Sequence, residues 1–165
     1  MAKSQNGWPV LDADHTRVWK IPGTERTLRL AKGAAGFVLV HTALFFHENV
    51  EKLGGGKWDE WGWADRDIRG STEISNHASG TAMDLNAVQH PLGVDDTFTA
   101  EQIETMHDRL RWMDDVVRWG QDYTERKDGM HFEINANRES VKALAKKLRK
   151  TELGERVAKA NPVNE

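Results

Sequence analysis

The chain has 165 residues, of which 23 are basic and 26 acidic, so its formal net charge is −3. This length suits one domain, and the near-neutral charge argues against a nucleic-acid-binding protein, whose first signature is a basic surface. The absence of cysteine excludes disulfide scaffolds, thiolate zinc sites and cysteine nucleophiles. Any metal must therefore be bound by His, Asp or Glu.

The first third of the chain predicts a polar start, a short strand and a buried helix. Residues 1–24 are polar and rich in turn formers, so we expect them to wrap the surface, and they contain no apolar segment typical of a secretory signal. Residues 26–30 alternate polar and apolar side chains, which predicts a strand. Residues 34–53 carry apolar side chains at helical spacing, and three glycines follow them. The longest apolar stretch, residues 33–46, is too short to span a membrane, which takes about 20 residues.

The middle of the chain predicts loops followed by a helix. Residues 57–98 are rich in Trp, Gly, Asp and Ser and contain two short β-like pieces, at 72–74 and 82–85. Residues 99–102 form a capping box. The helix that begins there has an apolar stripe that extends to Val117, and we expect it to end near Gly120.

The last third predicts a strand and a final helix. Residues 130–134 alternate, so the side chains of His131 and Glu133 should share one face of a strand. Asn137 is a suitable cap for a helix over about residues 138–150, and we expect the charged tail after Gly154 to fray.

This order of elements predicts an α+β fold in which a small, mainly antiparallel sheet packs against helices. We expect residues 1–165 to form a single catalytic domain, with a motif-bearing core at about 26–137 and a metal ion in a surface cleft.

The first cluster of chemically interesting residues is the segment 75–84, which reads SNHASGTAMD. His77 and Asp84 can share a metal ion only if the chain turns between them, because a straight strand or helix would hold them too far apart. The run 78–81 can supply that turn, and Gly80 can adopt a positive φ. We therefore expect His77 on a loop and Asp84 in the strand that follows.

The second cluster is the segment 128–133, which reads DGMHFE. Its Asp-Gly pair permits a tight turn that brings Asp128 near the imidazole of His131, although such a pair is also typical of a simple hairpin turn. Zinc lowers the pKa of a bound water to about 7, and a nearby carboxylate can take the proton of that water and later deliver it to the leaving amine. His77, Asp84 and His131 would supply three ligands and leave a fourth position for water or substrate, as catalytic zinc sites require.

The two clusters in this order resemble the zinc peptidases of the VanY and VanX D-alanyl-D-alanine carboxypeptidase type. The resemblance is greatest to the bacteriophage endolysins that are L-alanyl-D-glutamate peptidases, and it covers about residues 26–137. It implies a metallopeptidase with one Zn²⁺ ion held by His77, Asp84 and His131, and with Asp128 as the catalytic acid and base.

The resemblance also implies roles for residues around the motif. Arg66 matches an arginine that polarises the scissile carbonyl or holds a substrate carboxylate, since a fixed guanidinium stabilises a developing oxyanion; Arg69 is a nearby competitor. Ser75 would orient the loop by bonding to its backbone or to substrate. Glu133 stands where some relatives carry a second histidine, so we interpret it as a partner of the ligands or as an alternative base.

Three tryptophans, Trp58, Trp61 and Trp63, lie next to Arg66 in the sequence. They are expected to pack in the core or at an edge of it. The functional alternative is an apolar wall beside the substrate peptide, with Trp63 as our candidate contact.

The function implied by the resemblance is hydrolysis of a peptide bond in bacterial peptidoglycan, between L-alanine and D-glutamate, by a phage endolysin. Such a protein is made in the host cytoplasm and reaches the cell wall after the membrane is permeabilised. Its partner would be the peptidoglycan stem peptide, not nucleic acid or a membrane, and we expect a monomer. The alternatives are a D-alanyl-D-alanine carboxypeptidase or dipeptidase, and a non-catalytic cell-wall-binding module stabilised by metal.

Overall fold

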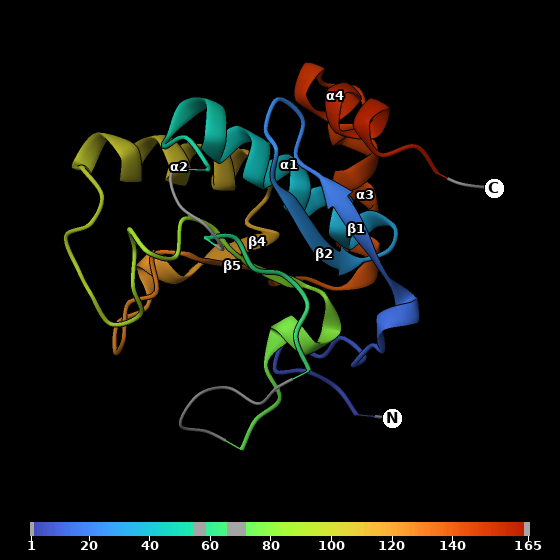
Figure 1. Ribbon diagram of the computed structural model, residues 1–165, viewed down its shortest axis with the longest axis horizontal. Helices are drawn as coiled ribbons and strands as arrows, with labels where there is room; N and C mark the ends of the chain where they lie inside the picture. Colours follow the sequence, from blue (N-terminus) through green and yellow to red (C-terminus); the bar gives the residue numbers. More distant parts are fainter. Residues whose placement is uncertain (1, 55–58, 66–71, 164–165) are drawn as a thin grey trace.

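The computed structural model describes residues 2–54, 59–65 and 72–163. Helices α1, α2 and α4 lie along one side of the strands, and the η2 turn lies on the other side together with the N-terminal segment (Figure 1). This arrangement confirms the predicted α+β class. In chain order the elements are η1 Ala13–His15, β1 Thr16–Lys20, β2 Thr27–Ala31, α1 Ala34–Asn49, η2 Asn76–Ser79, β3 Ala82–Asp84, α2 Ala100–Trp112, β4 Val117–Trp119, η3 Gly120–Asp122, β5 His131–Ile134, α3 Arg138–Leu148 and α4 Glu152–Ala160.

The strands form two small antiparallel sheets. Strands β1 and β2 pair with each other, and the second sheet has the order β3-β5-β4, so β5 lies in its centre. In the pairing of β3 with β5, Asp84 lies opposite His131 and Ala82 lies opposite Glu133. This register brings the two motif segments side by side.

Helix α1 is the centre of the fold. Its sequence is apolar almost all round, as is typical of a buried helix, and it packs against β2, β5, α3 and α4. The ring of Phe46 on this helix contacts the ring of Phe132 at a centroid distance of 5.8 Å, and Phe132 in turn stacks on Trp119 at 5.5 Å. These aromatic contacts hold β5 firmly against the core. In the part of the chain that is described, no helix combines the length and the apolar character needed to cross a bilayer.

The helix predicted to reach Val117 ends earlier than expected. Helix α2 begins with the predicted capping box, but it stops at Trp112, because Asp114 and Asp115 adopt left-handed backbone angles with φ of 58° and 54°. Aspartate tolerates this conformation better than most residues. The chain reverses there, and Val117 belongs to β4, where it pairs with Ile134 of β5.

The C-terminal tail is folded, which corrects the expectation that it frays. Helix α3 begins at the predicted cap, Asn137, whose side chain accepts a hydrogen bond from the N–H of Ser140. A further helix, α4, is capped by Thr151 and packs against α1, with Val157 fully buried. Burial of this apolar face explains why so charged a segment is ordered.

The N-terminal segment also does more than wrap the surface. Strand β1 lies within it, and Trp19 is almost fully buried. Before β1, the N–H of Gln5 donates to the carbonyl of Ile74, and the N–H of Leu11 donates to the carbonyl of Ala78. The segment is thus bound to the loop that carries the first motif.

Candidate metal centre

A tight turn presents His77. The Oγ of Ser75 accepts a hydrogen bond of 3.1 Å from the N–H of His77, which is one of the two roles predicted for that serine. Gly80 then closes the turn with a φ of 65°, as the sequence predicts. A Cβ atom at Gly80 would lie only 2.5 Å from the backbone nitrogen of Ala31, so β2 approaches this turn too closely for any other residue. Both the conformation and the space require glycine here.

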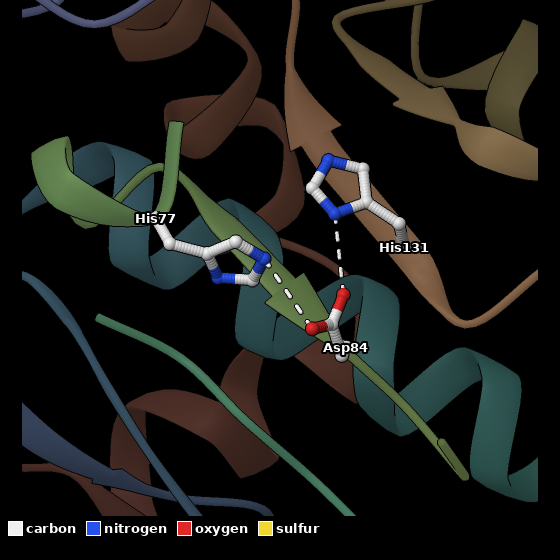
Figure 2. Close-up of side chains that lie close together, drawn as sticks. All are labelled: His77, Asp84 and His131. Atoms are coloured by element: carbon white, nitrogen blue, oxygen red, sulfur yellow. Dashed lines mark hydrogen bonds and ion pairs between the residues drawn. The ribbon is translucent and has the colours of Figure 1, made fainter. Parts of the chain in front are cut away.

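The structure brings His77, Asp84 and His131 together, as expected from the motif. His77 comes from η2, Asp84 from β3 and His131 from β5, and the three side chains point toward one another (Figure 2). The Nε2 of His77 lies 3.3 Å from Oδ2 of Asp84, and the Nδ1 of His131 lies 3.2 Å from Oδ1 of the same carboxylate. One potential ligand atom from each residue lies within 4.8 Å of the other two. We call these three residues the triad.

These distances suit a zinc ion. Two ligand atoms that each lie about 2.0–2.1 Å from a tetrahedral zinc are roughly 3.3–3.4 Å apart, close to the distances from His77 to Oδ2 and from His131 to Oδ1, the two separate oxygens of Asp84. His77 is buried, with 3% of its side chain exposed, whereas 12% of the His131 side chain is exposed. A ligand would therefore reach the triad from the side of His131.

The remaining nitrogen of each imidazole is held by an acceptor. The Nδ1 of His77 lies 2.8 Å from the carbonyl oxygen of Gly62, and the Nε2 of His131 lies 2.8 Å from Oε1 of Glu133. Because a carbonyl and an ionised carboxylate only accept hydrogen bonds, both of these nitrogens carry a proton. The lone pairs of neutral imidazoles would then be on the atoms that face Asp84. Outer partners of this kind are typical of metal-bound histidines.

The electrostatics of the triad favour positive charge. Burial alone would raise the pKa of Asp84, but His77 and His131 overcome it and hold that pKa far below its usual range. Burial would likewise lower the pKa of His131, yet its hydrogen bonds to Asp84 and Glu133 raise it to about 10. A proton is therefore stabilised between Nδ1 and Asp84, and a metal cation is the natural replacement for that proton.

Asp128 lies beside the triad with a carboxyl group that is only partly satisfied. Its Oδ1 is buried and has no hydrogen-bond partner. Burial raises the pKa of this group and the charge of Asp84 raises it further, while His131 and His77 lower it. The backbone of Asp128 is fixed at both ends, since its N–H donates to the carbonyl of Gly120 and its carbonyl accepts from the N–H of His131. A carboxyl group with one unpartnered oxygen in this position is free to exchange a proton.

The glycine that follows Asp128 serves packing more than turn geometry. The backbone of Gly129 does not adopt a positive φ. A Cβ atom there would lie 3.1 Å from side-chain atoms of both Gln121 and Phe98. Close packing, and not a left-handed backbone, is what demands a small residue at this position.

Glu133 is a partner of the triad, one of the two roles that the sequence predicts for it. Its carboxylate accepts hydrogen bonds from His131, from the hydroxyl of Tyr123 at 2.5 Å and from the side-chain amide of Asn76 at 2.9 Å. Burial alone would raise the pKa of Glu133, but His131 and Tyr123 lower it. Neither Tyr123 nor Asn76 was predicted. Asn76 stands inside the motif at a position that the motif leaves open, and Tyr123 is the single tyrosine of the chain.

The other predicted site residues divide into two groups. Arg66, Arg69 and Trp58 lie outside the described residues. Trp63 is described, and its indole N–H lies 3.1 Å from the carbonyl oxygen of Leu11 and 3.2 Å from that of Ala78. These contacts tie Trp63 to the turn that carries His77, and its predicted contact with substrate remains a prediction.

Comparison with known proteins yields one match. Residues 69–134 match the sequence model of the family described as D-alanyl-D-alanine carboxypeptidase. The match supports membership of that family. The matched range contains all three triad residues and Asp128. No curated protein and no solved structure shows significant similarity to the chain.

Proposed function

We propose that this protein is a zinc peptidase that hydrolyses a peptide bond in bacterial peptidoglycan. The observation that supports this proposal is the triad, whose outer nitrogens are held by acceptors and whose neighbour Asp128 has a buried oxygen without a partner. The family match supports the same chemistry, since D-alanyl-D-alanine carboxypeptidases are peptidases. When bound, a zinc ion supplies a Lewis acid for the scissile carbonyl and lowers the pKa of a coordinated water.

The chain's own residues would then handle the protons. Asp128 takes a proton from the attacking water and returns it to the amine that leaves, so the same carboxyl group serves as base and as acid. Its raised pKa suits both steps, because a carboxylate with a higher pKa is a stronger base toward the water and holds the proton until the leaving amine takes it. Arg66, on the basis of the resemblance, would stabilise the oxyanion that develops on the substrate carbonyl.

We further propose that the scissile bond joins L-alanine to D-glutamate and that the protein acts as a phage endolysin, made in the host cytoplasm and released to the wall by a separate membrane lesion. The motif resemblance is the support for both statements. The second candidate is a D-alanyl-D-alanine carboxypeptidase or dipeptidase, which the description of the matched family favours.

A non-catalytic wall-binding module is less well supported. Such a module needs the metal ligands but not an acid or base, and a buried carboxyl oxygen without a partner is costly to keep. Asp128 retains that costly feature beside the triad, as a catalytic group would.

Digestion of purified peptidoglycan distinguishes these functions. We expect new N-terminal D-glutamate in the soluble products, identified by mass spectrometry, and no products after complete removal of metal by a chelator. Free D-alanine or the D-alanyl-D-alanine dipeptide in its place would select the second candidate. Full turnover after chelation, or binding to the wall without any cleavage, would contradict both peptidase proposals. Restoration by added Zn²⁺ serves as the control for damage by the chelator.

A further inference from the structure

The carboxylate of Glu133 is fixed by donors from three separate elements. His131 lies on β5, Asn76 at the start of η2, and Tyr123 immediately after η3. Only 3% of Asn76 and 5% of Glu133 are exposed. Burial of a carboxylate without hydrogen-bond donors costs free energy, so these three donors hold Glu133 in one place. Glu133 in turn determines which nitrogen of His131 carries a proton.

The direction of each hydrogen bond follows from groups that have a single role. The backbone N–H of Asn6 donates to Oδ1 of Asn76 at 2.8 Å, so the Nδ2 of that amide must face Oε2 of Glu133. Burial and the nearby Glu133 raise the pKa of the Tyr123 hydroxyl, which therefore stays protonated and donates. His131 is left to donate from Nε2, with Nδ1 directed at Asp84.

Asn6 is itself anchored to the strands of the site. Its side-chain amide donates to Oγ1 of Thr81 at 2.8 Å and to the carbonyl of Ile134 at 2.9 Å. Thr81 directly precedes β3, and Ile134 ends β5. The N-terminal segment thus joins the two strands that carry Asp84 and His131, and from there it orients Asn76.

We propose that Asn76 and Tyr123 are positioning residues that act through Glu133 to hold His131 in the tautomer and orientation that bind metal. The N-terminal segment contributes to the same centre by fixing the amide of Asn76. This inference rests on the proposed function in so far as it assumes that the triad binds zinc. Groups in such outer positions typically change metal affinity by about 10–100-fold.

A double-mutant cycle on Zn²⁺ affinity tests this role without any measurement of activity. We expect Tyr123→Phe to weaken Zn²⁺ binding about tenfold and Glu133→Ala by about 10–100-fold, as measured by competition with a chelator of known affinity. Because Tyr123 acts through Glu133, the double variant should bind Zn²⁺ within about twofold of Glu133→Ala alone. Thr42→Val is the matched control, since it removes a buried hydroxyl that donates to the carbonyl of Val38 within α1.

A second variant covers the case in which Glu133→Ala does not fold. Asn76→Asp keeps the size of the side chain but sets an oxygen against Oε2 of Glu133, so we expect about tenfold or greater loss of Zn²⁺ affinity. In ¹⁵N-histidine spectra of the zinc-loaded protein, His131 should be protonated at Nε2 in the wild type and show a mixed or altered state in this variant.

Three results would overturn this proposal. The first is a Zn²⁺ affinity of Tyr123→Phe and Asn76→Asp equal to that of the Thr42→Val control. The second is a loss of Zn²⁺ affinity in the double variant equal to the product of the losses in Tyr123→Phe and Glu133→Ala. In both cases the wild type still binds zinc, so the proposed function stands and only the positioning role falls. The third is a His77→Ala variant that binds Zn²⁺ as tightly as the wild type, and this result would overturn both the positioning role and the proposed function.

A separate observation concerns Trp61, which is 52% exposed beside the triad. The backbones of Trp61 and Asp84 exchange two hydrogen bonds, of 3.0 Å and 2.8 Å, as an antiparallel pair. Residues directly opposite each other in such a pair direct their side chains to the same face. The indole therefore lies on the face of the sheet that carries the Asp84 carboxylate.

The segment around Trp61 is rigidly held. The carbonyl of Gly62 accepts from His77, and the N–H of Trp63 donates to the carbonyl of Arg29 at 2.6 Å. A Cβ atom at Gly62 would lie 2.2 Å from that same carbonyl oxygen. A large aromatic surface that stays exposed on so fixed a backbone is ready to contact a ligand at little entropic cost.

We infer that Trp61 is a substrate-binding residue that forms an apolar wall for the short side chains of the peptidoglycan peptide. This inference rests on the proposed function, and it assigns to Trp61 the contact that the sequence suggested for Trp63.

Steady-state kinetics on a purified muropeptide test the inference. We expect Trp61→Ala to raise KM about tenfold, which corresponds to the loss of roughly 60 Å² of apolar contact, with kcat and Zn²⁺ affinity nearly unchanged. Trp112→Ala is the matched control, because Trp112 is also exposed, at 40%, but ends α2. Equal KM values for the two variants would overturn the inference while leaving the peptidase proposal intact, and an inactive wild type would overturn both.

Discussion

Replacement of Asp128 by asparagine is expected to reduce the rate of peptidoglycan hydrolysis by about 10²–10⁴-fold, the usual contribution of a general acid and base. The amide has the same shape but cannot accept the proton of the attacking water. The three triad residues are unchanged, so Zn²⁺ affinity should stay within about threefold of the wild type. The measurement is the release of soluble muropeptides, paired with chelator competition on the same preparations.

The matched control is Asp122→Asn, which changes an exposed aspartate that bonds His107 at 2.7 Å. This variant should keep wild-type activity. Burial raises the pKa of Asp128, so its ionised form opposes folding at pH values above that pKa. The metal-free Asp128→Asn protein should therefore be no less stable than the wild type at neutral pH. Retention of more than about a tenth of wild-type activity would contradict the assigned role.

Replacement of His131 by alanine is expected to have the largest combined effect on metal binding and stability. It removes a ligand, so Zn²⁺ affinity should fall by more than about 100-fold, the upper end of what the loss of an outer partner costs, and hydrolysis should fall with it. It also leaves the buried carboxylates of Asp84 and Glu133 without their shared cation. Removing one partner of a buried ion pair costs about 3–5 kcal/mol, which denaturant unfolding of the metal-free protein would measure.

The pH dependence of this destabilisation provides a further check. The pKa of His131 is raised to about 10 in the folded, metal-free protein, above the unfolded value of about 6.5. Its protonation therefore stabilises the fold fully below about pH 6.5, and this stabilisation is lost as the pH rises toward 10. The difference in stability between the wild type and His131→Ala should shrink over that range. His107→Ala is the control, and a constant difference would contradict the charge assignment.

The elements that the sequence predicts well are those with strong local signals. The caps at Thr99 and Asn137 form as predicted, because a capping side chain bonds to backbone only three residues away. The end of α2 is different. Val117 fits the apolar stripe of a helix and the inward face of a strand equally well, and pairing with β5 decides for the strand. The charged side chains of the tail suggested that it frays, but α4 is ordered because it packs against α1. The pattern of residues within the tail does not by itself reveal this packing.

The candidate site divides in the same way. His77, Asp84, Asp128 and His131 are identifiable because metal binding and proton transfer permit few residue types, and the spacing of those types restricts them further. Glu133 was predicted as a partner of these residues, but Asn76 and Tyr123 were not, because any hydrogen-bond donor of suitable reach can bond to Glu133. Asn76 and Glu133 are 57 residues apart, and nothing in the sequence indicates that they meet.

The sequence by itself determines the chemical composition of this centre: two imidazoles, one aspartate and a second carboxyl group, on segments that a glycine can turn. The tertiary structure decides the rest. Pairing of β3 with β5 sets Asp84 opposite His131, and a shift of one residue would direct one of these side chains to the other face of the sheet. The N-terminal segment and Tyr123 then reach Glu133 from distant parts of the chain. Ligand identity is a property of single residues, whereas the orientation of a ligand depends on packing between segments that only the folded chain brings together.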